Sequence, residues 1–350
     1  MEVKASKRRP IPDRKLGIGL IGCGSIAQES HLPAIKRIPQ ANLVAVADSN
    51  GSRAREASEK FEAERWFEDY RALLEMEDAE AVDICAPTKF HAEIAVAAAR
   101  AGKHVLCEKP IALSLRDADR MIRACAENKV KLMVAHSRRF IPRYRIVRRM
   151  IMEGLIGEPV WATQISRRTM AESVSWYFDP SMTLGPAAEV GVHEADLLRW
   201  IFADDVTEVR AIATRTAEMK VYEQVFASLT FKKGMVASFE VGYVLPRGFT
   251  QYTTLEVLGS RGFVSASDNH MNVVTHGTET GATYPLAYSD LLSVNSAYEN
   301  EIVAFVDSIL NNANPPVTGA DARAALEIIL AVLQSVEHDE PVKLPLKEAL

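Results

Sequence analysis

The first part of the chain alternates between short apolar runs and longer amphipathic segments. The apolar runs have strand length and cover residues 16–21, 42–47, 65–67, 81–86, 104–107 and 131–135. Segments with helical periodicity lie between them, at 28–38, 53–61, 69–76, 91–101 and 115–129. Strands that are apolar throughout and joined through helices are typical of a parallel sheet covered on both faces. The pattern therefore predicts an α/β domain over residues 16–138.

The pattern changes after residue 139. Longer runs rich in β-branched residues follow at 160–169, 206–216, 221–231, 235–244, 252–258, 262–267 and 271–275, with helical segments at 144–153, 187–202, 297–311 and 321–337. Glycine-containing turns join several of these runs as hairpins. Residues 139–350 are expected to form an α+β domain with a large, mostly antiparallel open sheet. The basic segment 1–15 reads as a flexible tail or as an arm that contacts a partner subunit.

A glycine-rich turn, Gly22-Cys23-Gly24-Ser25-Ile26-Ala27, joins the first predicted strand to the first helix. Backbone N–H groups and the positive end of the helix dipole face such a turn, which suits the pyrophosphate of a dinucleotide. Gly22 allows a sharp bend, Gly24 lets the pyrophosphate approach the backbone, and Ala27 lets helix and strand pack closely. An ordinary glycine turn is the alternative. The functional interpretation makes the first domain a Rossmann domain.

An acidic residue stands where such a domain would hold the adenosine ribose. Asp48 lies 24 residues after Gly24, at the carboxyl end of the second predicted strand. A carboxylate there accepts hydrogen bonds from ribose hydroxyls and repels a 2′-phosphate, so NAD is favoured over NADP. The nearby Arg53 keeps NADP open as the alternative cofactor. For Asp48 itself, the alternative to ribose binding is a structural role as the N-cap of the following helix.

Composition narrows the class of protein. The chain has 350 residues, 48% hydrophobic and 25% charged, with a formal net charge of −5, which fits a two-domain globular protein. No stretch approaches the ~20 apolar residues of a membrane span. The arginines within 138–149 are expected on a solvated face, so no nucleic-acid site is predicted. The four cysteines form no CxxC pair and read as buried thiols in a reducing compartment, which predicts a cytoplasmic protein.

Four segments together resemble one known family. These are residues 83–88 followed by His91, residues 101–110 (AGKHVLCEKP), residues 185–196 (GPAAEVGVHEAD) and residues 316–322. Their order and spacing resemble the glucose-fructose oxidoreductase/inositol dehydrogenase (Gfo/Idh/MocA) family from residue 16 to 346. The resemblance implies a dinucleotide-binding domain, then a sheet domain that commonly packs against another subunit. It also implies oxidation of a secondary hydroxyl of a sugar, sugar acid or cyclitol, or the reverse reduction.

The chemistry needs a base for the hydroxyl proton and a positive group beside the developing alkoxide. The resemblance assigns His193 as the base and Lys109 as the cation; a structural histidine and an exposed loop lysine are the alternatives. Glu189 precedes His193 by four residues, so both lie on one helix face, where the carboxylate can contact substrate or orient the imidazole. An X–Pro bond tolerates cis geometry, so a cis Lys109-Pro110 bond is compatible with this turn.

Two departures from the family pattern bear on substrate. Glu189 stands where the family usually has Asp, and Pro186-Ala187 replaces glycines, which should stiffen the loop before the helix. Arg167 and Arg168, at the end of a second-domain strand, can bind a carboxylate or phosphate, or serve as sheet-edge charges. Asp196 can bind a hydroxyl or form a helix-face ion pair.

The predicted site residues fall into two further groups. Cofactor contacts are expected from Gly22, Gly24, Ser25, Ile26, Ala27, Asp48, Arg53, Ala86, Pro87, Thr88, His91, Glu108 and Lys109. Substrate contacts are expected from Lys109, His136, Arg167, Arg168, Trp176, Glu189, His193 and Asp196, with Arg139 and Tyr177 near the same cleft. No metal site is predicted, because no HExxH or comparable cluster is present.

Three functions remain open from the sequence. The principal hypothesis is an NAD(P)-dependent dehydrogenase acting on a CH–OH group of a sugar, sugar acid or cyclitol. A redox-neutral, NAD-dependent glycoside hydrolase or lyase of the same fold is the second, and a non-catalytic NAD-binding regulator is the third. Expected partners are a small polyol and a second copy of the chain, bound through the open sheet as dimer or tetramer, with neither nucleic acid nor membrane.

Overall fold

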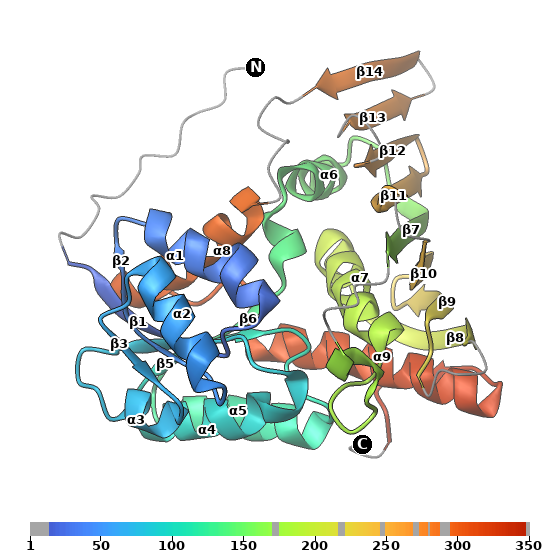
Figure 1. Ribbon diagram of the computed structural model, residues 1–350. Coiled ribbons are helices and arrows are strands. Elements are labelled where there is room, and N and C mark those ends of the chain that lie inside the picture. Colours follow the sequence, from blue (N-terminus) through green and yellow to red (C-terminus); the bar gives the residue numbers. More distant parts are fainter. Residues whose placement is uncertain are drawn as a thin grey trace.

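The computed structural model describes residues 14–169, 175–215, 221–245, 249–268, 273–278, 281–287 and 295–347. The predicted tail therefore lies almost wholly outside the described residues. Two sheets dominate the molecule, each with its own helices, and they stand side by side (Figure 1). No helix among the described residues is long and apolar enough to cross a membrane.

The first sheet has six parallel strands in the order β3-β2-β1-β4-β5-β6. This is the strand order of a dinucleotide-binding Rossmann fold, so the predicted class of the first domain is confirmed. The strands are β1 (Leu16–Ile21), β2 (Ala41–Ala47), β3 (Arg65–Phe67), β4 (Ala81–Ile84), β5 (His104–Glu108) and β6 (Leu132–Ala135). The helices are α1 (Leu32–Arg37), α2 (Gly51–Phe61), α3 (Tyr70–Leu74), α4 (His91–Arg100) and α5 (Leu115–Glu127), with a short 3-10 turn, η2 (Thr88–Phe90).

The helix after the glycine turn is not a single α-helix. A π-helical segment, η1 (Ala27–His31), precedes α1, and Pro33 occupies the first turn of α1. Proline has no N–H and its ring crowds the carbonyl four residues earlier, which explains why the preceding turn is widened. The sequence predicted one helix over 28–38, so its position is confirmed and its regularity is not.

Within the part of the chain that the structure describes, the second sheet has nine strands in the order β14-β13-β12-β11-β7-β10-β9-β8-β15, and the β7–β10 pair alone is parallel. The mostly antiparallel open sheet is therefore confirmed. Its strands are β7 (Pro159–Thr169), β8 (Val206–Thr214), β9 (Gln224–Phe231), β10 (Val236–Leu245), β11 (Tyr252–Gly259), β12 (Gly262–Ser267), β13 (Val273–Thr278), β14 (Gly281–Ala287) and β15 (Val342–Lys343). The two outermost strands, β14 and β15, were not predicted.

Helices cover one face of this sheet. α6 (Pro142–Met152), α7 (Pro186–Phe202) and α9 (Gly319–His338) lie on the side that faces the first domain (Figure 1). Pro186 is the first residue of α7 and follows Gly185, whose φ is 97°, so the proline that was expected to stiffen a loop begins a helix instead.

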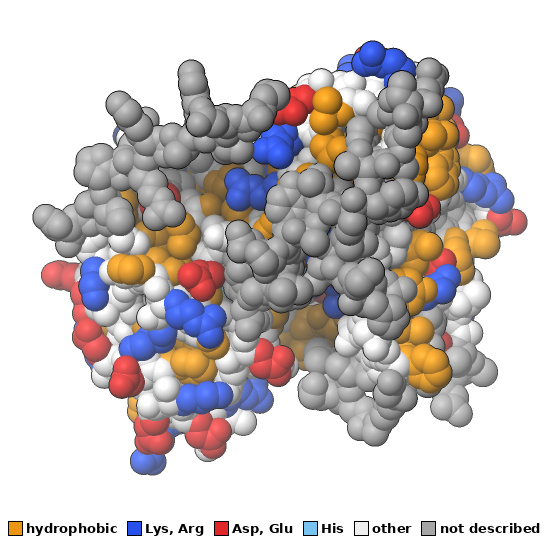
Figure 2. Space-filling model, turned by 90° about the horizontal axis from the view of Figure 1, so that it is seen from above, with side chains coloured by type: hydrophobic (Ala, Val, Ile, Leu, Met, Phe, Trp, Pro, Cys, Tyr) orange, Lys and Arg blue, Asp and Glu red, His pale blue; other side chains and the backbone are white. Residues whose placement is uncertain are grey.

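The other face exposes large apolar side chains. Cross-strand partners Phe263, Leu258, Trp161 and Val236 form a row over β12, β11, β7 and β10. Ile212 and Phe226 pair on β8 and β9 but are displaced along the strands from this row, because Phe226 lies opposite Glu240 and not Val236. Hydrophobic side chains are visible on the side of the molecule where this sheet lies, at the right in Figure 2. We call these six residues the outer face.

The chain returns to the first domain near its end. α8 (Asn295–Leu310) packs against η1, α1 and the 3-10 turn η3 (Ser137–Phe140), so Phe305 shares a core cluster with Leu16. α9 then packs against α5 of the first domain as well as α7 and β8 of the second. Residues 139–350 are thus not one packing unit in space.

Three arginines of the 138–149 segment are buried, contrary to the solvated face predicted for it. Arg138, Arg139 and Arg143 are each no more than 6% exposed. Each pairs with a carboxylate from a distant part of the chain: Glu194, Asp196 and Asp268 respectively. Sequence periodicity placed these arginines on a polar helix surface, but η3 and the start of α6 lie between the two sheets, where ion pairs compensate their burial.

Candidate active site

A cavity of about 430 Å³ lies where the carboxyl ends of β4 and β5 face α7 and the second sheet. Its walls come from both domains. Side chains that line it and carry the arguments below are Thr88, Glu108, Lys109, Arg138, Arg168, Trp176, Tyr177, Glu189, His193 and Tyr243. Ligands bind at the carboxyl edge of such parallel sheets, so the cavity lies where the fold favours a site.

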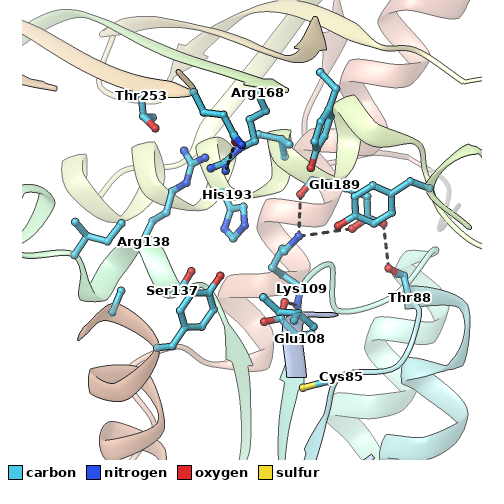
Figure 3. A pocket seen from close by; sticks show the side chains of 18 of the residues that line it. Cys85, Thr88, Glu108, Lys109, Ser137, Arg138, Arg168, Glu189, His193 and Thr253 are labelled. Atoms are coloured by element: carbon cyan, nitrogen blue, oxygen red, sulfur yellow. Dashed lines mark hydrogen bonds and ion pairs between the residues drawn. The ribbon is translucent and has the colours of Figure 1, made fainter. Parts of the chain in front are cut away.

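Lys109 follows β5 at this edge and projects into the cavity (Figure 3). The Lys109-Pro110 bond is cis, as the sequence allowed. The Lys109 backbone N–H donates to Glu108 Oε2 at 3.1 Å, and its Nζ donates to the Glu189 carbonyl oxygen at 3.2 Å. Glu189 Oε2 lies 3.7 Å from Nζ. The ammonium is therefore held by α7 across the domain boundary.

Glu189 is buried, and one of its two oxygens accepts two hydrogen bonds. Its Oε1 accepts hydrogen bonds from Thr88 Oγ1 at 3.0 Å and from Thr183 Oγ1 at 2.6 Å. Burial raises the pKa of this carboxyl, while Lys109 and the two hydroxyls oppose the rise. No hydrogen bond among the described residues joins Glu189 to the His193 imidazole, and the substrate contact predicted for Glu189 stays a prediction. The carboxylate lies beside Lys109 and bonds to hydroxyls from both domains, Thr88 and Thr183.

His193 lies one helical turn after Glu189 on the same face of α7, between Lys109 and Arg168 (Figure 3). Burial lowers the pKa of His193 well below 6.5, and the positive charges of Lys109 and Arg138 lower it further. Its Nδ1 is buried without a hydrogen-bond partner among the described residues. The neutral imidazole is therefore the form present at neutral pH, and it can accept a proton.

A buried chain of hydrogen bonds, Asp83–His31–Glu108, lies behind Lys109 and was not predicted from the sequence. His31 Nε2 contacts Glu108 Oε1 at 2.8 Å, and His31 Nδ1 contacts Asp83 Oδ2 at 2.8 Å. Burial is the largest single effect on His31 and disfavours its charge, but Asp83 and Cys85 together outweigh burial and raise the pKa of the imidazole well above 6.5. Burial likewise opposes ionisation of Glu108, and the hydrogen bond from His31 lowers the pKa of that carboxyl. The imidazolium thus fixes Glu108, which in turn holds the Lys109 backbone.

A groove of about 770 Å³ adjoins the cavity and shares Ile26, Cys85, Trp176 and Tyr177 with it. Its walls include the predicted pyrophosphate turn and ribose site: Gly22, Gly24, Ser25, Ile26, Asp48 and Arg53. A Cβ added at Gly24 would meet no atom within 4 Å, so the space beside its backbone is open for a ligand. These residues fit an extended dinucleotide whose reactive end reaches the cavity.

Asp48 faces this groove but does not cap the following helix. Asn50 is the N-cap of α2, with its side chain accepting from Arg53 N at 3.1 Å. Asp48 accepts backbone N–H bonds from Cys23 and Asn50, each at 2.8 Å, which fixes the carboxylate against the glycine turn. Arg53 Nη1 lies 3.4 Å from Asp48 Oδ2. The N-cap alternative is therefore wrong.

The loop after β4 lines the site and also contacts the Lys109 turn. Ala86 and Pro87 line the groove or cavity, as predicted for cofactor contacts. His91 lines the cavity too, but its Nδ1 contacts the Pro110 carbonyl and its Nε2 the Ala86 carbonyl, each at 2.8 Å. We interpret His91 as a clamp between this loop and the Lys109 turn.

Two predicted substrate residues lie outside the cavity. Asp196 is 1% exposed and forms a bidentate ion pair with Arg139, one contact being 2.7 Å. His136 is fully buried beside it, 3.8 Å from Asp196 Oδ2. Neither lines the cavity, so the helix-face ion pair is the correct alternative for Asp196.

Aromatic side chains form the boundary between cavity and groove. Trp176 and Tyr177 line both, and their rings meet edge to face at 4.4 Å. Tyr243 and Tyr298, which were not predicted, also line the cavity. Their positions depend on β10 and α8 reaching the site from far along the chain, for which the sequence carries no local signal.

One group among the described residues has the spacing of a metal site: His31, Asp83 and Cys85. Both nitrogens of His31 are already bonded to carboxylates. Burial raises the pKa of the Cys85 thiol, so the thiolate that a metal needs is disfavoured. The expectation that no metal site exists stays a prediction.

Comparison with known proteins agrees with this geometry. Residues 16–136 match the family model described as "Oxidoreductase family, NAD-binding Rossmann fold", and residues 144–265 match the GFO/IDH/MocA C-terminal domain. The chain is 32% identical to an inositol 2-dehydrogenase of Rhizobium meliloti and 30% identical to the myo-inositol 2-dehydrogenase of Thermotoga maritima. Both alignments cover 93% of this chain and 98% of the relative.

Among solved structures, scyllo-inositol dehydrogenase from Lactobacillus casei, with bound NAD(H) and scyllo-inositol, has a TM-score of 0.81 and 25% identity. That match covers 94% of this chain and 99% of the other. The two domain models, in the predicted order, account for the cofactor groove and for the sheet domain opposite it. The chain belongs to the GFO/IDH/MocA oxidoreductase family.

Proposed function

We propose that this protein is an NAD-dependent dehydrogenase that oxidises a secondary hydroxyl of a sugar, sugar acid or cyclitol, or reduces the corresponding ketone. The observation that carries the proposal is the convergence of Lys109 Nζ and the His193 imidazole on one cavity that joins the dinucleotide groove. An ammonium and a neutral imidazole facing the same space are the pair that alcohol oxidation needs.

In this mechanism the chain supplies proton transfer and charge stabilisation. The groove residues Gly22, Gly24 and Asp48 would hold NAD, which would supply the hydride acceptor for the carbinol carbon. His193 takes the hydroxyl proton, and Lys109 stabilises the negative charge that develops on the oxygen. Glu189 and the His31–Glu108 pair hold Lys109 in place from two sides. Reduction reverses the proton transfer, with protonated His193 as the donor.

Replacement of His193 by asparagine tests the base assignment. We expect His193→Asn to lower kcat by about 10²–10⁴-fold, because a positioned general base contributes about that much. NAD affinity, measured by titration calorimetry, should stay unchanged. His338→Asn, on an exposed histidine at the end of α9, is the matched control. Turnover of His193→Asn at the wild-type rate would contradict the proposal. NADH accumulation during turnover separates this function from a redox-neutral hydrolase or lyase.

We also propose NAD rather than NADP as the physiological cofactor. Asp48 is held at the groove by two backbone donors, and a carboxylate at the end of the second strand of such a fold would repel a 2′-phosphate. Asp48→Asn is expected to lower the ratio of kcat/KM for NAD to kcat/KM for NADP. The amide has nearly the same shape as the carboxylate but no charge that repels a 2′-phosphate. An unchanged ratio argues against this role.

Self-association through the outer face is part of the same proposal. The six apolar side chains defined above lie across neighbouring strands with no described element packed on them. Contiguous apolar patches on soluble proteins mark interaction sites.

The four cysteines are free and buried, which supports action in a reducing compartment such as the cytoplasm.

A further inference from the structure

Arg167 and Arg168 are neighbours in sequence but face opposite sides of the second sheet. Side chains alternate along a strand, so Arg168 shares the helix-covered face of β7 with Gln164 and Ser166, which are fully buried. Arg167 projects toward the outer side, where its guanidinium bonds to both oxygens of Glu240 and to Tyr252. The sequence offered the two arginines as a pair of anion ligands. Both residues line the cavity, but the Arg167 guanidinium is already paired with Glu240, whereas that of Arg168 is bonded only to the amide of Gln251 among the described residues.

The cations around the cavity are neutralised with one exception among the described residues. Arg138 pairs with Glu194, Arg143 with Asp268 and Arg167 with Glu240. Lys109 lies beside Glu189. The half-buried Arg168 has no described carboxylate within ion-pair distance, and its one side-chain hydrogen bond is to the neutral amide of Gln251 at 3.5 Å.

We propose that Arg168 binds a carboxylate of the substrate, so that the enzyme acts on acidic polyols such as aldonates in preference to neutral sugars or cyclitols. This inference rests on the proposed function, and it deepens that function by naming the substrate class. Arg168 lies across the cavity from Lys109, with His193 between them (Figure 3). A carboxylate on Arg168 therefore holds the chain of hydroxyls against His193 and Lys109.

The chemistry of the guanidinium favours a carboxylate over a phosphate. Its planar fork matches either anion in a bidentate bond. A phosphate monoester carries about 1.5 to 2 negative charges at neutral pH, and one unpaired guanidinium leaves part of that charge uncompensated. A carboxylate carries one charge, which matches the single unpaired cation.

The positive charge around His193 also favours an anionic substrate. Lys109, Arg138 and Arg168 each lower the pKa of this imidazole, in addition to the larger effect of burial. A substrate carboxylate bound at Arg168 offsets part of this positive potential and raises the proton affinity of His193 when substrate is present. An anionic substrate thus improves the base that acts on it.

Binding measurements without turnover test the inference. The probes are matched acid and alcohol pairs that differ only in the carboxylate: D-gluconate with D-glucitol, D-galactonate with galactitol, and D-ribonate with ribitol. Their affinities are measured by calorimetry with the NADH-loaded enzyme, in which the alcohols have no hydride acceptor. At least one acid should bind about 10- to 100-fold more tightly than its partner, the range for a charge-assisted hydrogen bond. D-glucitol 6-phosphate forms the phosphate arm.

Variants identify the residue responsible. Arg168→Gln should abolish the preference for the acid while leaving the affinity for the alcohol unchanged, and Arg168→Lys should keep part of the preference. Arg120→Gln, on a half-exposed arginine of α5 far from the cavity, removes the same charge as a control. Unfolding midpoints verify that each variant folds.

The outcomes are distinct from those for hydride transfer. An acid preference that depends on Arg168 supports the inference even if His193→Asn shows the proposed reaction to be wrong. The inference is overturned if no acid binds more tightly than its alcohol, if Arg168→Gln keeps the preference, or if the phosphate binds more tightly than gluconate through Arg168. Each of these results leaves the proposed dehydrogenase reaction standing.

Discussion

The protonation state of His193 sets how the enzyme should respond to pH. Burial and the charges of Lys109 and Arg138 lower the pKa of His193 well below 6.5, and His136 and Arg168 add smaller effects in the same direction. His193, the proposed base, is neutral above its pKa and becomes protonated as the pH falls through it. For the oxidation, kcat/KM should stay constant from neutral pH down to 6.5 and decline only at more acidic pH. A pH profile of kcat/KM measures this, and an acidic limb at or above 6.5 contradicts it.

The buried Asp196–Arg139 pair predicts a loss of stability without a change in substrate affinity. Asp196→Ala leaves the Arg139 guanidinium buried without its main partner, which should lower the free energy of unfolding by about 3–5 kcal/mol. Asp205→Ala removes the partner of Arg199 in an exposed pair, 68% exposed at Asp205, and should cost less than about 1 kcal/mol. Urea denaturation compares the two. A raised KM with unchanged stability in Asp196→Ala would restore the substrate role first considered for it.

At the scale of elements, the two glycines of the turn after β1 have separable roles. Gly22 has a φ of 96°, and a Cβ there would lie 2.6 Å from Ala86 N, so Gly22→Ala should destabilise the fold by at least about 1–2 kcal/mol. A Cβ at Gly24 meets nothing within 4 Å, so Gly24→Ala should unfold at the wild-type temperature. It should nevertheless weaken NAD binding by about tenfold or more, ~1.4 kcal/mol, because the methyl fills the space for the pyrophosphate. Thermal unfolding and calorimetry measure the two effects, and wild-type NAD affinity in Gly24→Ala excludes that role.

Elements with continuous apolar runs were predictable, and elements without them were not. The strands of the first sheet were located to within two residues, because all but the short, exposed β3 are mostly apolar and buried on both faces. β14 (GATYPLA) contains a glycine and a proline. Edge strands tolerate proline, but neither residue indicates a strand in the sequence pattern. His31 could not be connected to Asp83 or Glu108, because its partners lie 52 and 77 residues away along the chain. Local patterns predict elements and end-of-strand residues, whereas contacts between distant side chains arise only when the sheets assemble.

At the scale of the whole molecule, the active site depends on the chain crossing between domains. The second sheet supplies Arg168 and Tyr243, α7 supplies Glu189 and His193, and α8 brings Tyr298 back to the edge of the first sheet. α9 packs on both domains and stabilises this arrangement. Sequence alone placed the boundary between residues 138 and 139, where the pattern changes, but it could not show that α8 would share a core with Leu16.

The last prediction concerns self-association of the chain through the outer face. Six large apolar side chains project from the uncovered side of the second sheet, and Phe226 (41% exposed) and Ile212 (62%) pair on β9 and β8, displaced along the strands from the other four. Phe226→Glu should dissociate the oligomer, because a carboxylate at the interface must be desolvated without a partner. Met152→Glu, at the exposed end of α6, is the matched control. Size-exclusion chromatography with light scattering should show an oligomer for wild type and Met152→Glu and a monomer for Phe226→Glu. A monomeric wild-type protein would leave the outer face without the second copy proposed to cover it.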